Sequence, residues 1–160
     1  MSANDRANVQ SYKSNDSGAQ KWNIYSNGDG TYRILNAANG KALDVSDGKA
    51  YAGANVQQFS WNGSAAQKWI IAYKENGAFE LRPFSNDSLI LEIAEPNPVS
   101  GSNVRLGSAS GGRNQLFTFE QTVYTPPMPS ERQIMLNRIS EYSSGTQYLV
   151  AVDRSAHKVG

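Results

Sequence analysis

The sequence predicts an all-β fold built from three pseudo-repeats, and three observations support this prediction. A Gln-x-aromatic triplet ends at Trp22, Trp69 and Phe117, with intervals of 47 and 48 residues. A nearly constant interval of this kind marks a structural repeat. The apolar stretches between the triplets are short and bounded by Gly, Asn, Ser or Asp, which is typical of brief strands joined by turns. Helical spacing of apolar residues is absent through residue 122, so repeats made of helical hairpins do not fit.

Other segments recur in the same register and indicate how many strands each repeat holds. "YRI" at 32–34 matches "FEL" at 79–81, "LDV" at 43–45 matches "LEI" at 91–93, and "NVQSY", "NVQQF" and "NVRLG" form a third series. A propeller needs about four blades, whereas 160 residues hold little more than three such units. A three-fold arrangement of four-stranded units, a β-trefoil, is therefore expected. The first repeat lacks an upstream "YxI…LDV" half and is expected to be truncated.

The order of "LDV", "NVQQF" and "AAQKW" resembles the ricin-type β-trefoil lectins, whose repeats carry a Gln-x-Trp signature. The similarity covers about residues 5–121, and the trefoil domain is expected to span residues 1–122. The resemblance implies that Trp22, Trp69 and Phe117 pack into the barrel core and that the signature glutamines hold nearby backbone. Rings of this size contribute heavily to a small β-core.

One repeat offers a candidate sugar site. If Leu43 and Val45 point inward, strand alternation turns Asp44 outward to solvent. A flat ring can cover the C–H face of a pyranose, while a carboxylate accepts hydrogen bonds from two neighbouring hydroxyls and an amide both donates and accepts. The resemblance implies binding of a galactose-like sugar, or of a cell-wall polysaccharide, through Asp44, Gln57, Phe59 and Gln67.

This candidate site departs from the lectin pattern at one position. Ala66 stands where the family has the Asn that precedes the signature Gln. Asn62, in the turn just before, is the residue that could compensate. The alternative is that Asp44 and Phe59 are inherited scaffold features without a ligand.

The other two repeats match the pattern less well. The third has Glu92 for the Asp and keeps Asn114, but Arg105 replaces the Gln and Gly107 replaces the ring, which predicts a degenerate site. The first keeps Gln10, Tyr12 and Gln20 without a carboxylate, and these three residues form a second, incomplete candidate site.

Trp61 carries two open interpretations. In disulfide-bearing relatives, the resemblance implies a bridge between cysteines at the positions of Trp61 and Ala42. A large ring opposite a small side chain is then an apolar replacement for that bridge. The alternative is an additional sugar platform.

After Gln121 the repeat pattern stops. Residues 123–130 are expected to form a Pro-rich linker, residues 131–142 a short amphipathic helix after a capping box at Ser130, and Tyr148–Val152 a strand. Residues 131–160 resemble the opening of an L,D-transpeptidase-like domain. Alternatively, the last strand fills the gap in the first repeat by pairing near Val9 or Ile34, within the chain or by exchange with a second copy.

Composition narrows the function classes. Fifteen basic and fourteen acidic residues without a basic run do not favour duplex nucleic acid or an anionic membrane as partner, and there are no cysteines. No apolar run approaches the roughly 18 residues of a membrane span. The only histidine, His157, follows a polar turn, and nothing assembles a nucleophile, base and oxyanion site.

The sequence therefore predicts a carbohydrate-binding module without enzymatic activity, cofactor or metal, secreted or at the cell surface as part of a larger bacterial protein. The alternative is a protein-interaction or spacer domain of a cell-wall enzyme.

Overall fold

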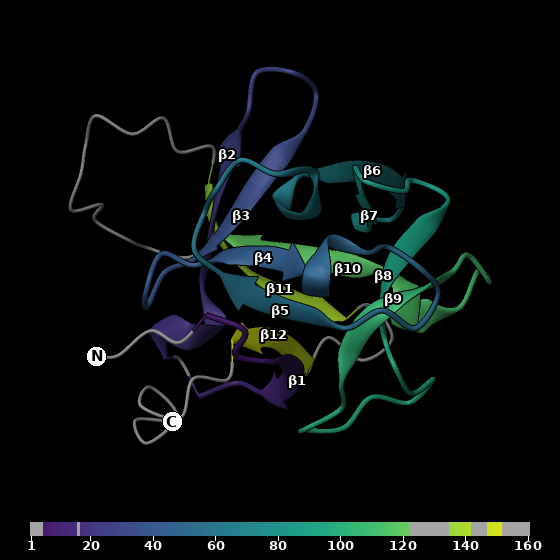
Figure 1. The fold of residues 1–160 in the computed structure, drawn as a ribbon. Coiled ribbons are helices and arrows are strands. Elements are labelled where there is room, and N and C mark those ends of the chain that lie inside the picture. The colour runs from purple at the N-terminus through teal and green to yellow at the C-terminus, as the bar shows by residue number, and fades with distance from the viewer. Residues whose placement is uncertain (1–4, 16, 122–134, 142–146, 152–160) are drawn as a thin grey trace.

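The computed structural model describes residues 5–15, 17–121, 135–141 and 147–151, and its strands form three units of four (Figure 1). The units contain β1 (Val9–Lys13), β2 (Trp22–Ser26), β3 (Tyr32–Asn36) and β4 (Ala42–Val45); β5 (Val56–Phe59), β6 (Trp69–Glu75), β7 (Ala78–Pro83) and β8 (Leu89–Ile93); and β9 (Val104–Ser108), β10 (Phe117–Gln121), β11 (Met135–Glu141) and β12 (Gln147–Ala151). A 3-10 turn precedes the second strand of each unit: η1 (Gly18–Gln20), η3 (Ala65–Gln67) and η4 (Arg113–Gln115). A further turn, η2 (Ser46–Gly48), follows β4.

Strand pairing repeats three times. The second and third strands of each unit are antiparallel partners, as in β2–β3, β6–β7 and β10–β11. The fourth strand pairs with a first strand, as in β4–β5, β8–β9 and β12–β1. Single contacts from β3 to β6 and from β7 to β10, together with β2–β11, join neighbouring units. The predicted β-trefoil is confirmed.

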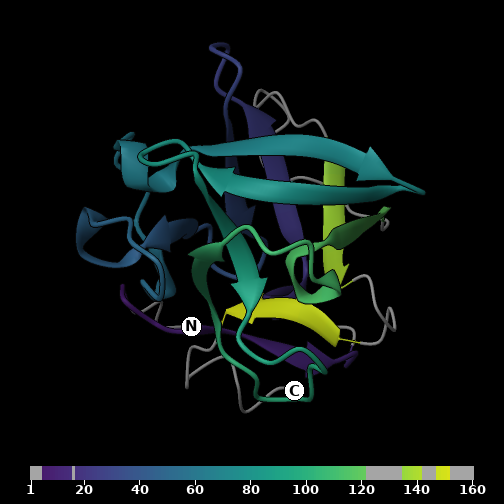
Figure 2. The same cartoon turned by 90° about the vertical axis from the view of Figure 1, so that its right-hand side faces the viewer.

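The half that the first sequence repeat lacks before β1 is supplied by the last two described strands, so the trefoil is complete. β12 pairs with β1 from Val9↔Ala151 to Lys13↔Gln147, and β11 lies between β2 and β10. In Figure 2 the yellow β12 runs beside the purple β1. The alternative in which the last strand pairs near Val9 is therefore the arrangement observed, and the pairing is within one chain.

The helix predicted for residues 131–142 is wrong where the structure describes it, because Met135–Glu141 is the strand β11. Two neighbours, β2 and β10, pair with this segment, and Ile139 is fully buried in the core. Non-local pairing thus outweighs a local apolar spacing that also suits a helix. The linker at 123–130, the remainder of the predicted helix and His157 lie outside the described residues.

The three signature aromatics lie in the core, as predicted. Trp22, Trp69 and Phe117 have no exposed surface. The indole N–H of Trp22 donates to the carbonyl of Leu149 at 3.0 Å, and that of Trp69 donates to the carbonyl of Leu43 at 2.9 Å. Each tryptophan therefore packs its ring while its one donor is satisfied.

The signature glutamines hold backbone, also as predicted. Each is buried, donates from Nε2 to the carbonyl at or just after the end of a first strand, and accepts at Oε1 from a backbone N–H two residues further on. The distances are 2.8 Å and 2.9 Å for Gln20 with Lys13 and Asn15, 2.8 Å and 2.7 Å for Gln67 with Ser60 and Asn62, and 2.7 Å and 2.9 Å for Gln115 with Ser108 and Ser110.

A ring of amides joins the three units. Asn8 donates to Asn103, Asn103 donates to Asn55, and Asn55 donates to Asn8, at 2.8 to 2.9 Å. These are the asparagines that open the three "NV" segments. The recurrence of Asn in that place is therefore explained by a closed hydrogen-bonded triangle rather than by a ligand.

Candidate functional site

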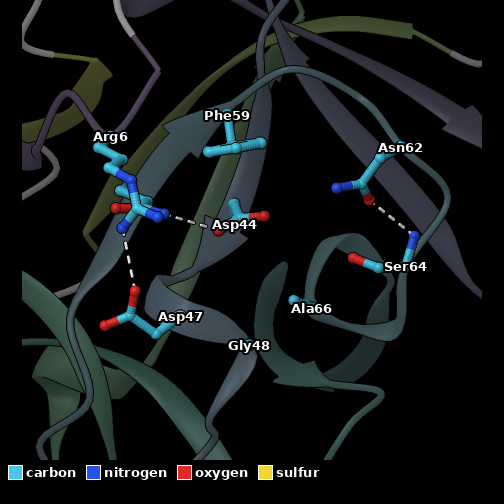
Figure 3. Close-up of a pocket in the computed structure, with 9 residues that line it drawn as sticks. Arg6, Asp44, Asp47, Gly48, Phe59, Asn62, Ser64 and Ala66 are labelled. Atoms are coloured by element: carbon cyan, nitrogen blue, oxygen red, sulfur yellow. Dashed lines mark hydrogen bonds and ion pairs between the residues drawn. The ribbon is translucent and has the colours of Figure 1, made fainter.

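A pocket of about 370 Å³ opens beside the β4–β5 pair (Figure 3). Its volume is at the lower end of the range for small-molecule sites, about 300 to 1,000 Å³. It is lined by Arg6, Asp44, Asp47, Gly48, Gln57, Phe59, Asn62, Ser64 and Ala66. The face predicted from strand alternation is therefore hollowed, and it brings Asp44 and Phe59 together.

Asp44 is more enclosed than predicted. Its residue surface is only 5% exposed, because β5 pairs alongside it and the loops around η2 and η3 form pocket walls with it, so the outward-facing carboxylate lies inside a pocket rather than on the open surface. Burial raises the pKa of Asp44, while hydrogen bonds from Gln57 and Gln67 oppose the rise. Gln57 Nε2 donates to Asp44 Oδ1 at 3.0 Å. In Figure 3 the other carboxylate oxygen is directed toward the Asn62 side of the pocket.

Phe59 forms the wall next to this carboxylate. The residue pairs with Ala42 at the end of the β4–β5 ladder, and its ring is partly exposed to the pocket. Figure 3 shows the ring on the same side of the pocket as Asp44. A ring face and a carboxylate are thus available to one ligand.

Asn62 and Ala66 lie across the pocket from Phe59. The backbone N–H of Ser64 donates to Asn62 Oδ1 at 2.9 Å, which fixes the amide orientation. The amide nitrogen then points into the pocket (Figure 3). Ala66, which replaces the Asn of the lectin pattern, has only a small side chain. Asn62 lines the same pocket and supplies an amide near that position.

Gln57 and Gln67 are placed to orient the carboxylate. Gln57 lies next to Asp44 in the pocket wall, and its Oε1 accepts from Ser46 Oγ at 3.4 Å. Gln67 is fully buried, lies outside the pocket lining, and uses its amide on the backbone and on Asp44. The sequence placed Gln67 among the sugar ligands, whereas its position in the structure is behind them.

Arg6 and Asp47 were missed by the sequence argument. Arg6 Nη1 lies 2.9 Å from Asp47 Oδ1, and the guanidinium carbon is 5.9 Å from the Phe59 ring centroid. Neither residue belongs to a repeat motif. The only local hint was the turn-forming "SDG" after β4, since strand alternation does not predict which loops fold over a face.

The equivalent place in the third sequence repeat, between β8 and β9, is closed. Arg105 Nε binds Glu92 Oε2 at 2.8 Å, and Gln115 donates to the other oxygen at 2.9 Å. A Cβ built on Gly107 would overlap this carboxylate, so Glu92 occupies the space of the missing side chain. Asn114 donates to the carbonyl of Ile93 at 2.7 Å. The residues that define the predicted degenerate site are thus engaged with one another.

The second candidate site has no carboxylate. Gln10 pairs with Val150 in the register that joins Gln57 to Asp44, so an apolar side chain stands at the acid position. Gln20 is buried and its amide is hydrogen-bonded to backbone. Gln10 and Tyr12 are the remaining residues of this predicted site. β12 takes the place of the strand that is missing before β1, but it carries no acid at the position opposite Gln10.

Trp61 does not form a buried apolar pair. It is 37% exposed, and the Arg33 guanidinium carbon lies 5.5 Å from its ring centroid. Arg33 also lies 4.9 Å from the Tyr25 ring, so it sits between two aromatic residues. The ring of Trp61 therefore makes a cation–π contact with Arg33.

Sequence comparison identifies the family. A profile described as "Ricin-type beta-trefoil lectin domain-like" matches residues 1–59 and 18–106. The chain belongs to this family. No curated protein matches this ricin-type trefoil by sequence.

Solved structures support the same fold. The designed three-fold symmetric protein ThreeFoil is 33% identical, with a TM-score of 0.70 over 73% of this chain and 83% of its own. A mosquitocidal holotoxin is 16% identical, with a TM-score of 0.66 over 95% of this chain and 25% of its own. A ricin B-like lectin from Macrolepiota procera, solved with lactose, is 16% identical, with a TM-score of 0.59 over 74% of this chain and 96% of its own.

Two features are absent from the residues that the structure describes. No cluster of three or more His, Asp or Glu side chains is arranged to hold a metal ion there. Within the same residues, no helix has the length and apolar character needed to span a bilayer.

Proposed function

We propose that this ricin-type trefoil binds a neutral, galactose-like sugar in the pocket of Asp44, Phe59 and Asn62. The observation that carries the proposal is the placement of a buried carboxylate next to an accessible aromatic ring in one pocket. A buried acid is costly in the free protein, since burial disfavours its charged form. A ligand that donates hydrogen bonds to the carboxylate would offset part of that cost.

Each side chain has a distinct role in this proposal. The Phe59 ring packs against the C–H face of the pyranose, and Asp44 accepts hydrogen bonds from two adjacent hydroxyls. The Asn62 amide donates to a third polar atom, and Gln57 and Gln67 orient the acid. A hexose has about 12 heavy atoms, and at about 0.3 kcal/mol per atom the Kd is about 1 mM. Useful retention on a surface then requires several linked modules.

The lectin from Macrolepiota procera, which was solved with lactose, supports a galactose-containing ligand for this fold. We also propose that the protein is secreted or lies at the cell surface, that its glycan belongs to a cell wall or another glycan-rich surface, and that the trefoil is part of a larger protein. The described residues of the segment that resembles an L,D-transpeptidase-like opening, Met135–Glu141 and Gln147–Ala151, are instead strands of the trefoil.

A second candidate function is a protein-interaction or spacer domain. The closed site between β8 and β9 and the Val150 side chain at the acid position between β12 and β1 favour it, because a scaffold can lose sugar ligands without losing its fold. A stable protein partner captured without any glycan response would support this alternative.

The test is a glycan-array screen followed by titration of galactose into the wild type, Asp44→Ala and Phe59→Ala. We expect each variant to weaken binding at least tenfold, since each removes a main contact. Glu92→Ala is the matched control, because it deletes an acid at the same register in the closed site and should leave the affinity unchanged. Binding that survives both site variants would place the sugar elsewhere.

A further inference from the structure

The segment before β1 is fixed against the outer edge of the site. Its backbone bonds both sides of Gln58: the N–H of Arg6 donates to the Gln58 carbonyl at 2.8 Å, and the N–H of Gln58 donates to the Ala7 carbonyl at 2.9 Å. Asp5 accepts from the Ser60 N–H at 2.8 Å and from Lys41 Nζ at 2.7 Å. The segment is therefore held in place on both sides of Arg6.

Within this segment, Arg6 adopts an unusual backbone conformation. Its φ is +72°, and Asp47, its partner across the pocket rim, has a φ of +57°. Left-handed φ is uncommon for residues other than glycine and costs free energy. The two strained residues meet at the rim beside Phe59, where Figure 3 shows the guanidinium and the carboxylate facing each other.

The ion pair between them adds little to folding by itself. The two side chains are 62% and 65% exposed, and an exposed pair of this kind contributes little. A ligand hydroxyl can therefore accept from Arg6 and donate to Asp47 without losing a strong protein contact. A donor and an acceptor side by side match the dual character of a hydroxyl group.

We propose that Arg6 and Asp47 form a second saccharide subsite, which binds a neutral hexose linked to the one held by Asp44 and Phe59. This inference rests on the proposed function of the same pocket. The charged residues of the pocket lining are one arginine and two aspartates. An acidic sugar would meet two carboxylates for each guanidinium, so a neutral unit is favoured.

The experiment compares galactose, lactose and sialyllactose by calorimetry on the wild type, Arg6→Ala and Asp47→Ala. We expect the wild type to bind lactose about fivefold to tenfold more tightly than galactose, and sialyllactose less tightly than lactose. The lactose-to-galactose preference should fall toward one in both variants. Arg105→Ala, an arginine in the closed third site, is the control and should keep the wild-type preference.

The outcomes separate the two proposals. Galactose binding that requires Asp44, combined with a lactose preference unchanged in Arg6→Ala and Asp47→Ala, would overturn the subsite and leave the proposed function standing. Sialyllactose binding tighter than lactose and dependent on Arg6 would overturn the neutral class. No binding of any of the three sugars would overturn the proposed function and the subsite together.

Discussion

Asp44 is buried and also lies at the centre of the proposed sugar site. A carboxylate at 5% exposure has lost most of its hydration, and the hydrogen bonds from Gln57 and Gln67 only partly replace it. The nearest residue of opposite charge in the pocket lining, Arg6, is engaged with Asp47. The surroundings of Asp44 therefore disfavour its charged form, which is common for acids at binding sites.

Sugar affinity should depend on pH through Asp44. Because its pKa is raised by burial, protonation begins above the ordinary pKa as pH falls, and the neutral acid is a poorer acceptor. We expect affinity to decline as the pH falls toward 3.8, the ordinary pKa of the group, with the decline beginning above that value. Titration calorimetry across this range would measure the decline, with Asp44→Asn as the variant that lacks this acid. A flat wild-type profile would contradict the role of the carboxylate.

The same shift has a linked effect on stability. A carboxyl group with a raised folded pKa binds its proton more tightly in the folded state, so its contribution to stability decreases as pH rises through that pKa. Relative to Asp44→Asn, the wild type should therefore gain stability when the pH is lowered over the same window.

At the scale of elements, the three 3-10 turns are stabilised in the same way by a buried glutamine. Truncating one of them leaves a backbone carbonyl and a backbone N–H without their part-buried hydrogen bonds, at about 1 to 2 kcal/mol each. We expect Gln20→Ala, Gln67→Ala and Gln115→Ala each to reduce the free energy of unfolding by about 2 to 4 kcal/mol in urea titrations.

Sugar binding distinguishes these three variants. Gln67 also reaches Asp44, whereas Gln20 has no acid at the equivalent position. Only Gln67→Ala should weaken galactose binding in addition to stability. Equal weakening by Gln20→Ala would show that the effect comes from general loosening of the fold.

Strands and site differ in how far the sequence could predict them. The roles of Trp22, Trp69 and the signature glutamines could be predicted because these residues recur at a fixed interval in a known family pattern. The strand β11 could not be predicted, because its sequence departs from the repeat pattern and its apolar spacing also suits a helix. The position of Arg6 could not be predicted either, because it depends on backbone hydrogen bonds to Gln58 and on a left-handed φ. No pattern in the sequence indicates these two features.

At the scale of the whole molecule, the fold depends on its last two strands. β11 lies between β2 and β10, β12 covers β1, and the Leu149 carbonyl satisfies the indole of Trp22. Removing them would expose strand edges and a buried donor. The expected trefoil boundary at residue 122 can be tested on this basis.

We expect a chain ending at residue 122 to lose cooperative thermal unfolding, as measured by circular dichroism. A chain ending at residue 151 keeps β11 and β12 and is the matched control, for which we expect a cooperative transition. Similar melting temperatures for the two chains would mean that the first 122 residues fold independently.

The pairing of the first strand with the last also sets an order of events during synthesis. Every residue of the pocket, from Arg6 to Ala66, leaves the ribosome long before Ala151, the partner of Val9. At about 5 to 20 residues per second, the interval is on the order of ten seconds. The nascent chain thus carries every residue of the proposed sugar site before the barrel that fixes their geometry can close, so we expect sugar binding to begin only after β12 has been synthesised.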